Sequence, residues 1–226
     1  MKERPILFNA EMVKAILSGR KTQTRRVLKV QPDEDGLLLF LPSNRWLDTS
    51  EREYICPFGN VGDHLWVREA FRMPKSLDIH SPSEVAELSL NAGYKNPWAP
   101  IQFESDGVRT GRWTGFDTPP VVTDAGKLRP SLHMPRWASR IDLLITGVRV
   151  ERLNDISEED ARAEGITDGG CINCGECEPC GCEHPAPDAT EMFAHLWQSI
   201  YGDANWFSNP WVWVIEFEVK KVGSHD

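Results

Sequence analysis

The sequence predicts an α+β protein that is mainly β, in which a small curved sheet or barrel carries short helices at its rim. Short apolar runs that suit strands recur along the chain, separated by turns rich in glycine and proline. Two segments repeat apolar residues at helical spacing, and a third opens with a helix-capping pattern. The 226 residues are enough to bury a sizeable core.

The first helix is predicted directly after Asn9, a residue type that caps helix N-termini. Gly19 is a favourable stop at its C-terminal end. Residues 20–26 follow, are all polar and carry four positive charges, so they form a dense set of donors suited to phosphate or a polar base edge. The buried face of the helix would consist of Met12, Val13, Ile16 and Leu17.

Short apolar runs indicate where strands lie in the middle of the chain. Residues 37–41 form one run, and a Gly62-Asp63 turn leads into a strand at 65–67. Residues 73–127 are rich in Pro, Gly, Ser and Asp, which predicts a long insertion of loops and short elements. Order returns at 141–153, a stretch rich in β-forming residues.

The C-terminal part is predicted to hold two helices and a closing strand. Ser157 begins a variant capping box that opens a short helix, and Gly165 ends that helix. Asp188 caps a second helix, whose apolar residues continue to Tyr201 at helical spacing. Alternating apolar residues between 211 and 219 predict a strand with one buried face.

Length and composition favour a single domain over residues 1–226, with insertions at about 73–127 and about 167–187. Apolar residues make up 40% and charged residues 26%, which excludes collagen-like, fully disordered and disulfide-scaffold chains. No apolar run approaches the ~20 residues of a membrane span, and the N-terminus lacks the apolar region of a signal peptide. We therefore expect a cytoplasmic protein with no membrane partner.

The net charge of −9 is distributed unevenly along the chain. Residues 1–30 hold eight basic and two acidic residues, whereas residues 151–191 hold twelve acidic residues and two arginines. Such a protein can present a basic groove to RNA or DNA while its acidic part maintains solubility. Ordinary mixed charge on helix surfaces is the alternative explanation.

Five of the six cysteines fall in one short segment, and Cys56 stands alone. Two-residue spacing between thiolates is typical of zinc sites, so we expect structural zinc, either one ion or two ions that share thiolates. An iron–sulfur cluster and a loop without metal are the alternatives. The candidate ligands are Cys171, Cys174, Cys177, Cys180, Cys182 and His184.

Two basic segments, 20–26 and 129–140, are candidates for nucleic-acid binding. Arginine clamps phosphate, and tryptophan stacks on bases at ~1–3 kcal/mol per base. The alternatives are a solvated connector for the first segment and, for the second, a loop that Met134 and Trp137 anchor to the core. The candidate residues are Arg20, Arg25, Arg26, Arg129, His133, Arg136, Trp137 and Arg140.

Three further residues have side chains suited to proton transfer or nucleophilic attack. Glu164 lies near the C-terminal end of its predicted helix, where the helix dipole disfavours a carboxylate by ~0.3–1 kcal/mol. This position suits a proton-transfer role, and an ordinary surface glutamate is the alternative. Lys21 and Thr24 would point to opposite faces of an extended chain, so they converge only if the chain turns between them.

These segments resemble the ASCH-domain family of the PUA-like superfamily, in the branch found in bacteriophages and prophages. The resemblance is carried by PILFNAEMVKAILSGRKTQTRRV at 5–27, by RPSLHMPRWASRIDLLITGVRVERLNDISEEDARAEGI at 129–166, and by the strands at 66–69 and 211–217. It leaves out residues 73–127 and the cysteine segment. It implies a PUA-like small β-barrel with peripheral helices and a cleft that handles RNA or nucleosides.

Minimal members of this family include amidohydrolases that deacetylate N4-acetylcytidine. Their site has the pattern Gly-Arg-Lys-Thr-x-Thr and a glutamate after a helix start, so the resemblance implies that Lys21, Thr24 and Glu164 are catalytic. Thr24 could attack with neutral Lys21 as its base, or water could attack while charged Lys21 stabilises the oxyanion. The sequence leaves both routes open.

Other family members are nucleases or RNA-binding modules, so the resemblance specifies the fold better than the activity. An amidohydrolase of N4-acylated cytidines is therefore one hypothesis. A non-catalytic RNA- or DNA-binding module, or a nuclease, in the same basic cleft is the second. A phage protein that binds a host protein through its acidic half is the third. Turnover of N4-acylated cytidines separates the first hypothesis from the others.

Overall fold

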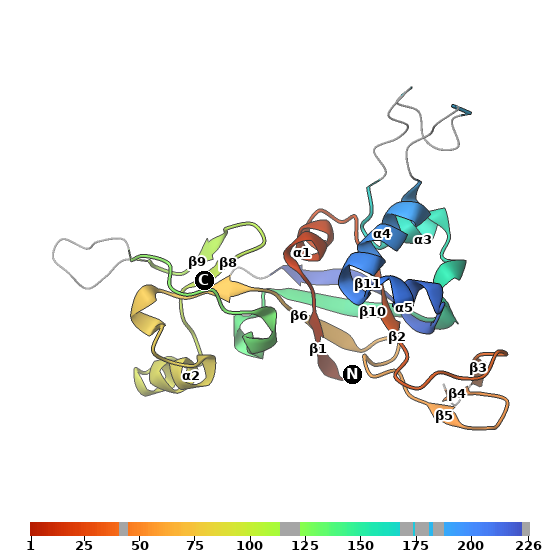
Figure 1. Ribbon diagram of the computed structural model, residues 1–226. Coiled ribbons are helices and arrows are strands. Elements are labelled where there is room, and N and C mark those ends of the chain that lie inside the picture. The colour runs from red at the N-terminus through yellow and green to blue at the C-terminus, as the bar shows by residue number, and fades with distance from the viewer. Residues whose placement is uncertain (41–44, 114–122, 168–173, 175–180, 183–187, 223–226) are drawn as a thin grey trace. The chain divides into compact units, whose positions relative to one another are not determined.

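The computed structural model describes residues 1–40, 45–113, 123–167, 174, 181–182 and 188–222 (Figure 1). The strands are β1 (Glu3–Leu7), β2 (Gln23–Val27), β3 (Leu38–Phe40), β4 (Arg45–Leu47), β5 (Glu53–Tyr54), β6 (His64–Arg68), β7 (Phe71–Arg72), β8 (Ile101–Phe103), β9 (Arg109–Thr110), β10 (Ile141–Arg152) and β11 (Trp211–Val222). The α-helices are α1 (Ala10–Leu17), α2 (Pro82–Asn91), α3 (Glu158–Ala163), α4 (Ala189–Tyr201) and α5 (Asp203–Phe207). The 3₁₀ turns are η1 (Lys75–Leu77), η2 (Ser131–His133), η3 (Arg136–Ala138) and η4 (Leu153–Asp155).

The described residues form a mixed α+β structure in which sheets dominate, and this confirms the predicted fold class at that level. One sheet has five strands in the order β1-β6-β10-β11-β2. Two smaller sheets have the orders β3-β4-β5 and β7-β8-β9. The pair β1-β6 is parallel, whereas β6-β10 and β11-β2 are antiparallel. Among the described strands, β1 and β2 are the two edges of the large sheet, so this sheet is open and is not a closed barrel.

The chain folds into two compact units, each with most of its contacts within itself. The first unit contains Met1–Leu17, Asp63–Leu144 and the chain from Val219 onward. The second unit contains Ser18–Gly62 and Ile145–Glu218. Strands β10 and β11 have residues in both units.

In the first unit, the predicted N-terminal helix is confirmed as α1. The Asn9 side chain accepts a hydrogen bond from the backbone N–H of Met12 at 2.8 Å, which is the expected N-cap contact. Val13 and Ile16 are buried on the apolar face of the helix. The hydrophobic core of this unit contains Phe71, Met73, Val85, Ala99, Ile101, Phe103, Met134 and Ala138.

The described part of the segment predicted as an insertion of loops and short elements, 73–127, contains the short elements η1, α2, β8 and β9. Helix α2 lies within it and begins with a complete capping box, because Ser81 and Glu84 each bond the other's backbone N–H. Pro82 occupies the first helical turn, where its missing N–H costs nothing. The Ser-x-x-Glu pattern is present in the sequence, but the apolar periodicity after it is too weak to predict a helix.

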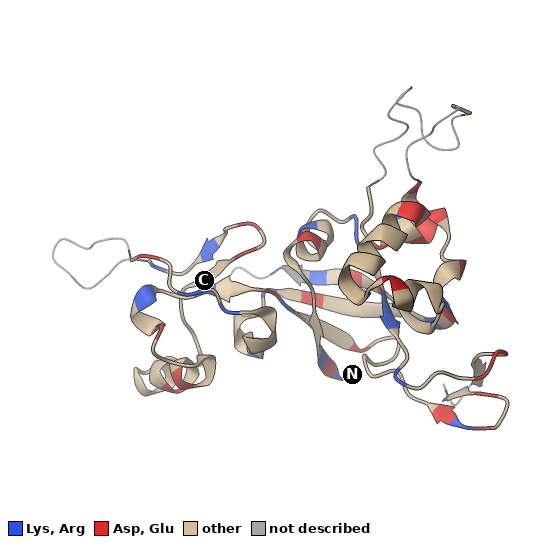
Figure 2. Ribbon diagram, viewed as in Figure 1, with Lys and Arg blue, Asp and Glu red and all other residues tan. Residues whose placement is uncertain are grey.

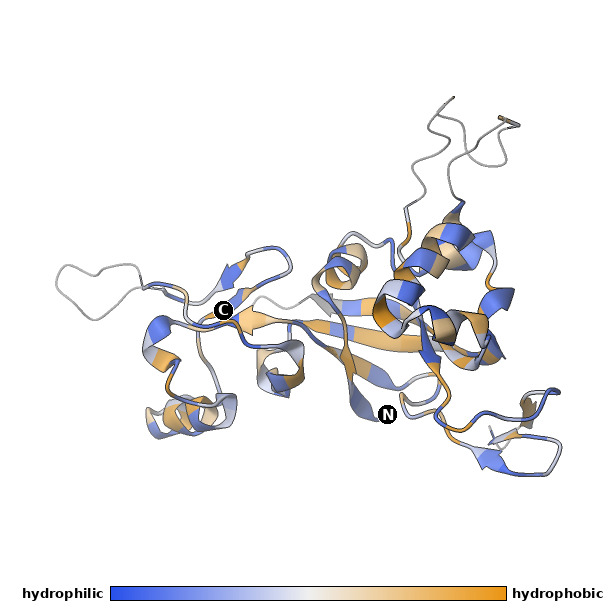
Figure 3. Ribbon diagram, viewed as in Figure 1, coloured by the Kyte–Doolittle hydropathy of each residue, from blue (hydrophilic) through white to orange (hydrophobic). Residues whose placement is uncertain are grey.

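In the second unit, α3 and α4 lie over strands β10, β11 and β2 (Figure 1). Ser157 and Asp188 cap the two helices as predicted, by accepting bonds from the backbone N–H groups of Asp160 and Glu191. Figure 3 shows the apolar character of β10 against the more polar helix surfaces. The core of the unit contains Leu153, Ile156, Ala161, Ala189, Phe193, Trp197, Val212 and Val214.

The all-polar segment 20–26, for which a solvated connector was the alternative, lies in a strand from Gln23 onward, because Gln23–Val27 is strand β2. Its five residues pair with Val212–Glu216 of β11. Strand β2 forms by pairing with β11, and its buried Gln23 and Arg25 side chains bond groups of α3, so an apolar pattern was not needed to form it. No helix among the described residues has the length and apolar character needed to cross a membrane.

Candidate functional site

The backbone brings Lys21 and Glu164 together in the second unit. The two residues form an isolated antiparallel β-bridge. The neighbouring N–H of Thr22 donates to the carbonyl of Ala163 at 2.8 Å, and the N–H of Phe217 donates to the carbonyl of Thr22 at 2.8 Å. The segment just before β2 is therefore held by both the C-terminal end of α3 and strand β11.

The Lys21 and Glu164 side chains form a buried ion pair. Lys21 Nζ lies 2.5 Å from Glu164 Oε2 and donates to the Glu164 backbone carbonyl at 2.8 Å. The side chains are only 1% and 4% exposed. Burial lowers the pKa of Lys21 most strongly, the Glu164 carboxylate opposes this, and the charges of Arg26 and Arg25 add to the lowering. The net pKa of Lys21 lies below its usual value.

Arg25 extends this pair into a larger network of charges. Its buried guanidinium contacts three carboxylates: Nη1 lies 3.3 Å from Glu164 Oε1, Nη2 lies 2.9 Å from Asp160 Oδ2, and Nη2 also bonds Glu151. Burial acts to raise the pKa of Asp160, but hydrogen bonding by Gln23 and the charges of Arg149 and Arg25 outweigh it and lower that pKa.

Arg149 of β10 forms the outer part of the network. Its Nη2 donates to Asp160 at 2.8 Å, its Nε donates to Glu151 at 3.0 Å, and it also bonds Glu216 of β11. Gly147 makes room for Glu216, because a Cβ at this position would collide with the Glu216 carboxylate. The network as a whole contains three cations and four carboxylates. Its members are Lys21, Arg25, Arg149, Glu151, Asp160, Glu164 and Glu216.

Strand alternation places Thr24 on the other face of β2. Gln23 and Arg25 contact α3 on one face, so Thr24 between them points to the opposite face. Thr24 lies opposite Ile215 in the β11 register. Its hydroxyl is buried and has no hydrogen-bond partner among the described residues. The structure thus brings Lys21 and Glu164 together, and the contacts of the described residues do not join Thr24 to them.

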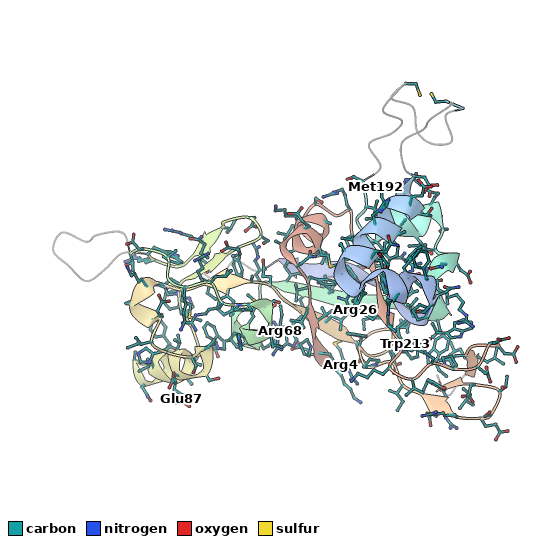
Figure 4. The ribbon with its side chains drawn as sticks, in the orientation of Figure 1. Arg4, Arg26, Arg68, Glu87, Met192 and Trp213 are labelled. Atoms are coloured by element: carbon teal, nitrogen blue, oxygen red, sulfur yellow. The ribbon has the colours of Figure 1, made fainter. Side chains whose placement is uncertain are left out.

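The first basic segment contains both exposed and buried arginines. Arg20 is exposed and donates to the Ser18 hydroxyl at 3.0 Å and to the Gly165 carbonyl at 3.3 Å. Arg26 is partly exposed and pairs with Trp213 across β2 and β11, where Figure 4 labels both. Arg25 is committed to the internal network. Figure 2 shows the basic residues of β2 and the acidic residues along α3 in the same unit.

The second basic segment lies in the first unit and is also partly internal. Arg140 is buried and bonds Glu69, Asp106 and Ser105, while Arg129 is buried and donates to two backbone carbonyls. Trp137 packs partly buried against the core. His133 and Arg136 are exposed, and Arg136 pairs with Glu3 at 3.0 Å.

Most of the candidate zinc ligands lie outside the described residues: Cys171, Cys177, Cys180 and His184. Cys174 is exposed and Cys182 is half-buried. The described residues contain no group of three or more His, Cys, Asp or Glu side chains arranged to hold a metal ion.

Sequence reasoning missed Glu151, Asp160, Arg149 and Glu216 as members of the charge network. A signal for part of it was present, because Arg149 and Glu151 alternate along β10 and so share a face with Gly147. The partner residues on α3 and β11 could not be assigned without the pairing of the strands.

Comparisons with known proteins add little to this geometry. No protein-family model matches the chain, and no curated protein sequence matches it. One solved structure with some likeness is that of protein EF3133 from Enterococcus faecalis V583, described with family-model DUF984. It is 11% identical, its TM-score is 0.39, and the alignment covers 100% of this chain and 85% of that chain. A likeness at this level carries no argument about function.

Proposed function

We propose that this protein acts on nucleic acid or a modified nucleoside, and that its leading activity is hydrolysis of an N4-acylated cytidine at the Lys21–Glu164 pair. The observation that carries the proposal is the buried contact of 2.5 Å between Lys21 Nζ and Glu164 Oε2. A desolvated lysine with a lowered pKa beside a carboxylate is a typical arrangement for proton transfer. The resemblance of residues 19–24 to the ASCH pattern supports the same assignment.

The finer assignment of the α+β fold to the PUA-like superfamily is part of this proposal, as is membership of the phage and prophage ASCH branch. Both rest on the sequence resemblance. Cytoplasmic localisation also belongs to the proposal, because clustered cysteines in a reducing compartment favour metal ligation over disulfides. A structural zinc held among Cys171, Cys174, Cys177, Cys180, Cys182 and His184 completes it.

In the proposed reaction, a water molecule attacks the acyl carbonyl carbon of the substrate. The Glu164 carboxylate takes a proton from that water, and the Lys21 ammonium donates a hydrogen bond to the developing oxyanion. The carbon–nitrogen bond then breaks, and the proton passes from Glu164 to the leaving nitrogen. The products are the free exocyclic amine of cytidine and a carboxylic acid, so the atoms and charges balance.

The position of Thr24 favours water over Thr24 as the nucleophile. Thr24 lies on the face of β2 away from Arg25, and a nucleophile must reach its base within about 2.6–3.2 Å. A role of Thr24 in attack would require the chain to rearrange between residues 21 and 24. We therefore assign Thr24 a smaller part in turnover than Lys21 and Glu164.

The burial of the pair sets a condition on the reaction. Lys21 and Glu164 are both buried, so a substrate must displace groups that cover them. Excluding water from the pair strengthens its electrostatic interactions while the site is closed.

A second candidate function is RNA or DNA binding without catalysis, or with nuclease activity. The exposed side chains of Arg20 and His133 and the accessible guanidinium groups of Arg26 and Arg136 support it. Each unit supplies part of this set, and each cation that neutralises a phosphate adds to the salt dependence of binding. Binding of a host protein through the acidic residues of 151–191 is a third hypothesis.

The test is turnover of N4-acetylcytidine by the full chain and by three variants. Lys21→Met and Glu164→Gln should each lower kcat by ~10²–10⁴-fold, because each removes a proton-transfer or oxyanion-stabilising group. Thr24→Val should cost less, and the double variant of Lys21 and Glu164 should lose little more than either single variant. Glu159→Gln removes the same charge from an exposed position and is the control.

Wild-type protein that hydrolyses no acylated nucleoside contradicts the amidohydrolase proposal. Salt-dependent binding to RNA or DNA by that inactive protein would favour the second candidate, and strand cleavage in the same mixture would favour a nuclease. A loss in Thr24→Val equal to that in Lys21→Met would restore Thr24 as the nucleophile.

A further inference from the structure

The two oxygens of the Glu164 carboxylate have different partners. Oε2 faces Lys21 Nζ at 2.5 Å, and Oε1 faces Arg25 Nη1 at 3.3 Å. A carboxylate with one anchored oxygen cannot rotate freely about its terminal torsion, so the direction of its other oxygen is fixed. Arg25 approaches from β2, and Glu164 stands at the C-cap of α3. The contact therefore joins a strand to a helix end.

We propose that Arg25 is a positioning residue, whose guanidinium fixes Glu164 so that Oε2 is aimed at Lys21. The role of Arg25 in turnover rests on the proposed function, whereas its role in fixing the position of Glu164 does not. The resemblance that singled out Lys21 and Glu164 assigned no such role to Arg25, which sequence reasoning placed among the nucleic-acid contacts. Its complete burial removes it from any surface contact in this structure.

Arg25 is itself held in place on its far side. Its Nη2 bonds Asp160 and Glu151, and Arg149 bonds the same two carboxylates. The planar guanidinium presents its donors in a rigid fork, so three carboxylates around it fix its plane. The aromatic ring of Phe193 lies 5.8 Å from the guanidinium carbon and covers it within the core.

The charges around the pair determine how its protons respond to the loss of Arg25. Cations near Lys21 and Glu164 are Arg25 and Arg26 from β2, with Arg20 at the Gly165 carbonyl and Arg162 on α3. The neighbouring carboxylates are Asp160 of α3 and Glu151 of β10, both bonded to Arg149. Burial lowers the pKa of Lys21, and Arg25 adds to that lowering through its charge. The Glu164 carboxylate acts in the opposite direction and more strongly than the Arg25 charge. If Arg25 holds Glu164 against Lys21, removing Arg25 should therefore lower the pKa of Lys21, whereas loss of the Arg25 charge alone would raise it.

A purely structural arginine would predict a different outcome. Arg25 could serve only to neutralise three carboxylates in the core of the unit, in which case Glu164 would keep its place beside Lys21 and loss of the Arg25 charge would raise the pKa of Lys21. The direction in which the titration of the Lys21 amine shifts therefore separates the two roles.

The experiment compares four full-length proteins: wild type, Arg25→Gln, Arg25→Lys and Arg149→Gln. The Lys21 Nζ titration is followed by NMR and assigned with Lys21→Arg. Arg25→Gln releases Glu164 and should move the Lys21 titration to lower pH. Arg25→Lys retains the charge but not the fork, so it should also move the titration to lower pH. Arg149→Gln is the matched control, because Arg149 shares two carboxylates with Arg25 but does not contact Glu164.

Kinetics on N4-acetylcytidine supply the second measurement. Arg25→Gln should lower kcat by ~10²-fold, since misplacement of a catalytic group by about 1 Å costs that much, while KM changes little. Arg25→Lys should recover only part of kcat, because a single ammonium cannot contact Glu164, Asp160 and Glu151 with the geometry of a fork. Arg149→Gln should retain most of the activity.

Arg25→Gln removes a buried cation that three carboxylates share, so a variant with restored charge balance is prepared beside it. The double variant Arg25→Gln/Glu151→Gln serves this purpose. A Lys21 titration that is unchanged or moves to higher pH in the folded variant overturns the inference, as does an equal shift in Arg149→Gln. If wild type shows no turnover, the proposed function fails, and the NMR titration alone decides the role of Arg25.

Discussion

Each of the two units buries an arginine among carboxylates, but the two clusters satisfy their hydrogen bonds differently. In the first unit, Arg140 donates to both oxygens of Glu69 at 2.9 and 3.0 Å, to Asp106 at 2.8 Å and to the Ser105 hydroxyl at 3.0 Å. All three of its nitrogens have partners. In the second unit, the Arg25 Nε has no hydrogen-bond partner among the described residues.

The comparison of the Arg140 and Arg25 clusters shows what distinguishes a structural cluster from a candidate active site. The guanidinium of Arg140 is fully matched, and the Phe103 ring covers it at 3.9 Å. The cluster of the second unit instead contains a buried lysine whose pKa is lowered. The unmatched arginine nitrogen is not by itself the distinction, because Arg129 Nε of the first unit is also buried without a hydrogen-bond partner among the described residues. Burial of ionisable groups is costly, and incomplete compensation is typical of sites kept for function rather than stability.

The largest expected effect is on the stability of the first unit. Arg140→Met should lower the free energy of unfolding by ~3–5 kcal/mol, because it leaves Glu69 as a buried charge without its bidentate partner. Denaturant unfolding followed by tryptophan fluorescence measures this change. Arg140→Lys should lose less, since it keeps one charge. A loss below that of the exposed-pair variant Arg45→Ala would erase the contrast between the two clusters.

The corresponding change in the second unit should be much smaller. Lys21→Met removes an amine that burial disfavours, and Glu164 keeps Arg25 as a partner. We expect the free energy of unfolding to stay within ~1 kcal/mol of wild type or to rise, as is common when a functional charge is replaced by an apolar group. The same denaturant assay measures it. A loss as large as that of Arg140→Met would assign Lys21 a structural role.

Acid should destabilise both clusters. Burial acts to raise the pKa of Asp106, but its hydrogen bond with Arg140 and other contacts lower it overall, and the pKa of Asp160 is also lowered. A carboxyl with a lowered folded-state pKa contributes stability above its unfolded pKa of about 3.9 and loses it as pH falls through the folded value. The denaturant concentration at the midpoint of unfolding should therefore decrease as the pH is lowered below about 4.

Substitution of these carboxyls gives the control for the acid effect. Asp106→Asn and Asp160→Asn should each flatten the loss of stability in acid, whereas Glu159→Gln at an exposed position should leave the pH dependence as in wild type. An unchanged acid profile in both aspartate variants would contradict the assigned role of these ion pairs.

A smaller effect is expected from the accessible arginines. Arg26→Ala and Arg136→Ala should each weaken polynucleotide binding and reduce the slope of log K against log salt by about one. Fluorescence anisotropy of a labelled RNA or DNA, measured over a salt series, provides both values. Arg45→Ala removes an equal charge from a pair with Glu53 and serves as the control. Wild-type binding by both variants would leave these segments as solvated connectors.

The smallest effect on the two clusters should come from metal removal. We expect about one zinc ion per chain or more, held among Cys171 to His184, and its removal by a chelator should barely change the unfolding of the two described cores. Elemental analysis and thermal unfolding before and after chelation test this. A protein purified without metal would contradict the zinc prediction, and a large fall of the thermal midpoint on chelation would contradict the independence of the two cores from the metal.

The sequence by itself determined the elements whose signals are local. Asn9, Ser157 and Asp188 predicted where three helices begin, because a cap bonds N–H groups only two or three residues further along the chain. The apolar runs of β10 and β11 were also readable, since burial of a strand imposes its pattern on the strand itself. The α+β class followed from these elements.

Tertiary structure alone decided the identity of β2 and the contents of the charge network. Gln23–Val27 is polar by sequence, and its strand pairing with β11 supplies what its composition does not. Lys21 and Glu164 are 143 residues apart, and Arg25 meets carboxylates from β10 and α3. Long-range Coulomb partners leave no periodic mark in a sequence, because a charge is stabilised by whichever opposite charge the fold brings near it. The opposite facing of Lys21 and Thr24 in an extended chain was readable from alternation, but only the pairing of β2 showed that the chain stays extended there.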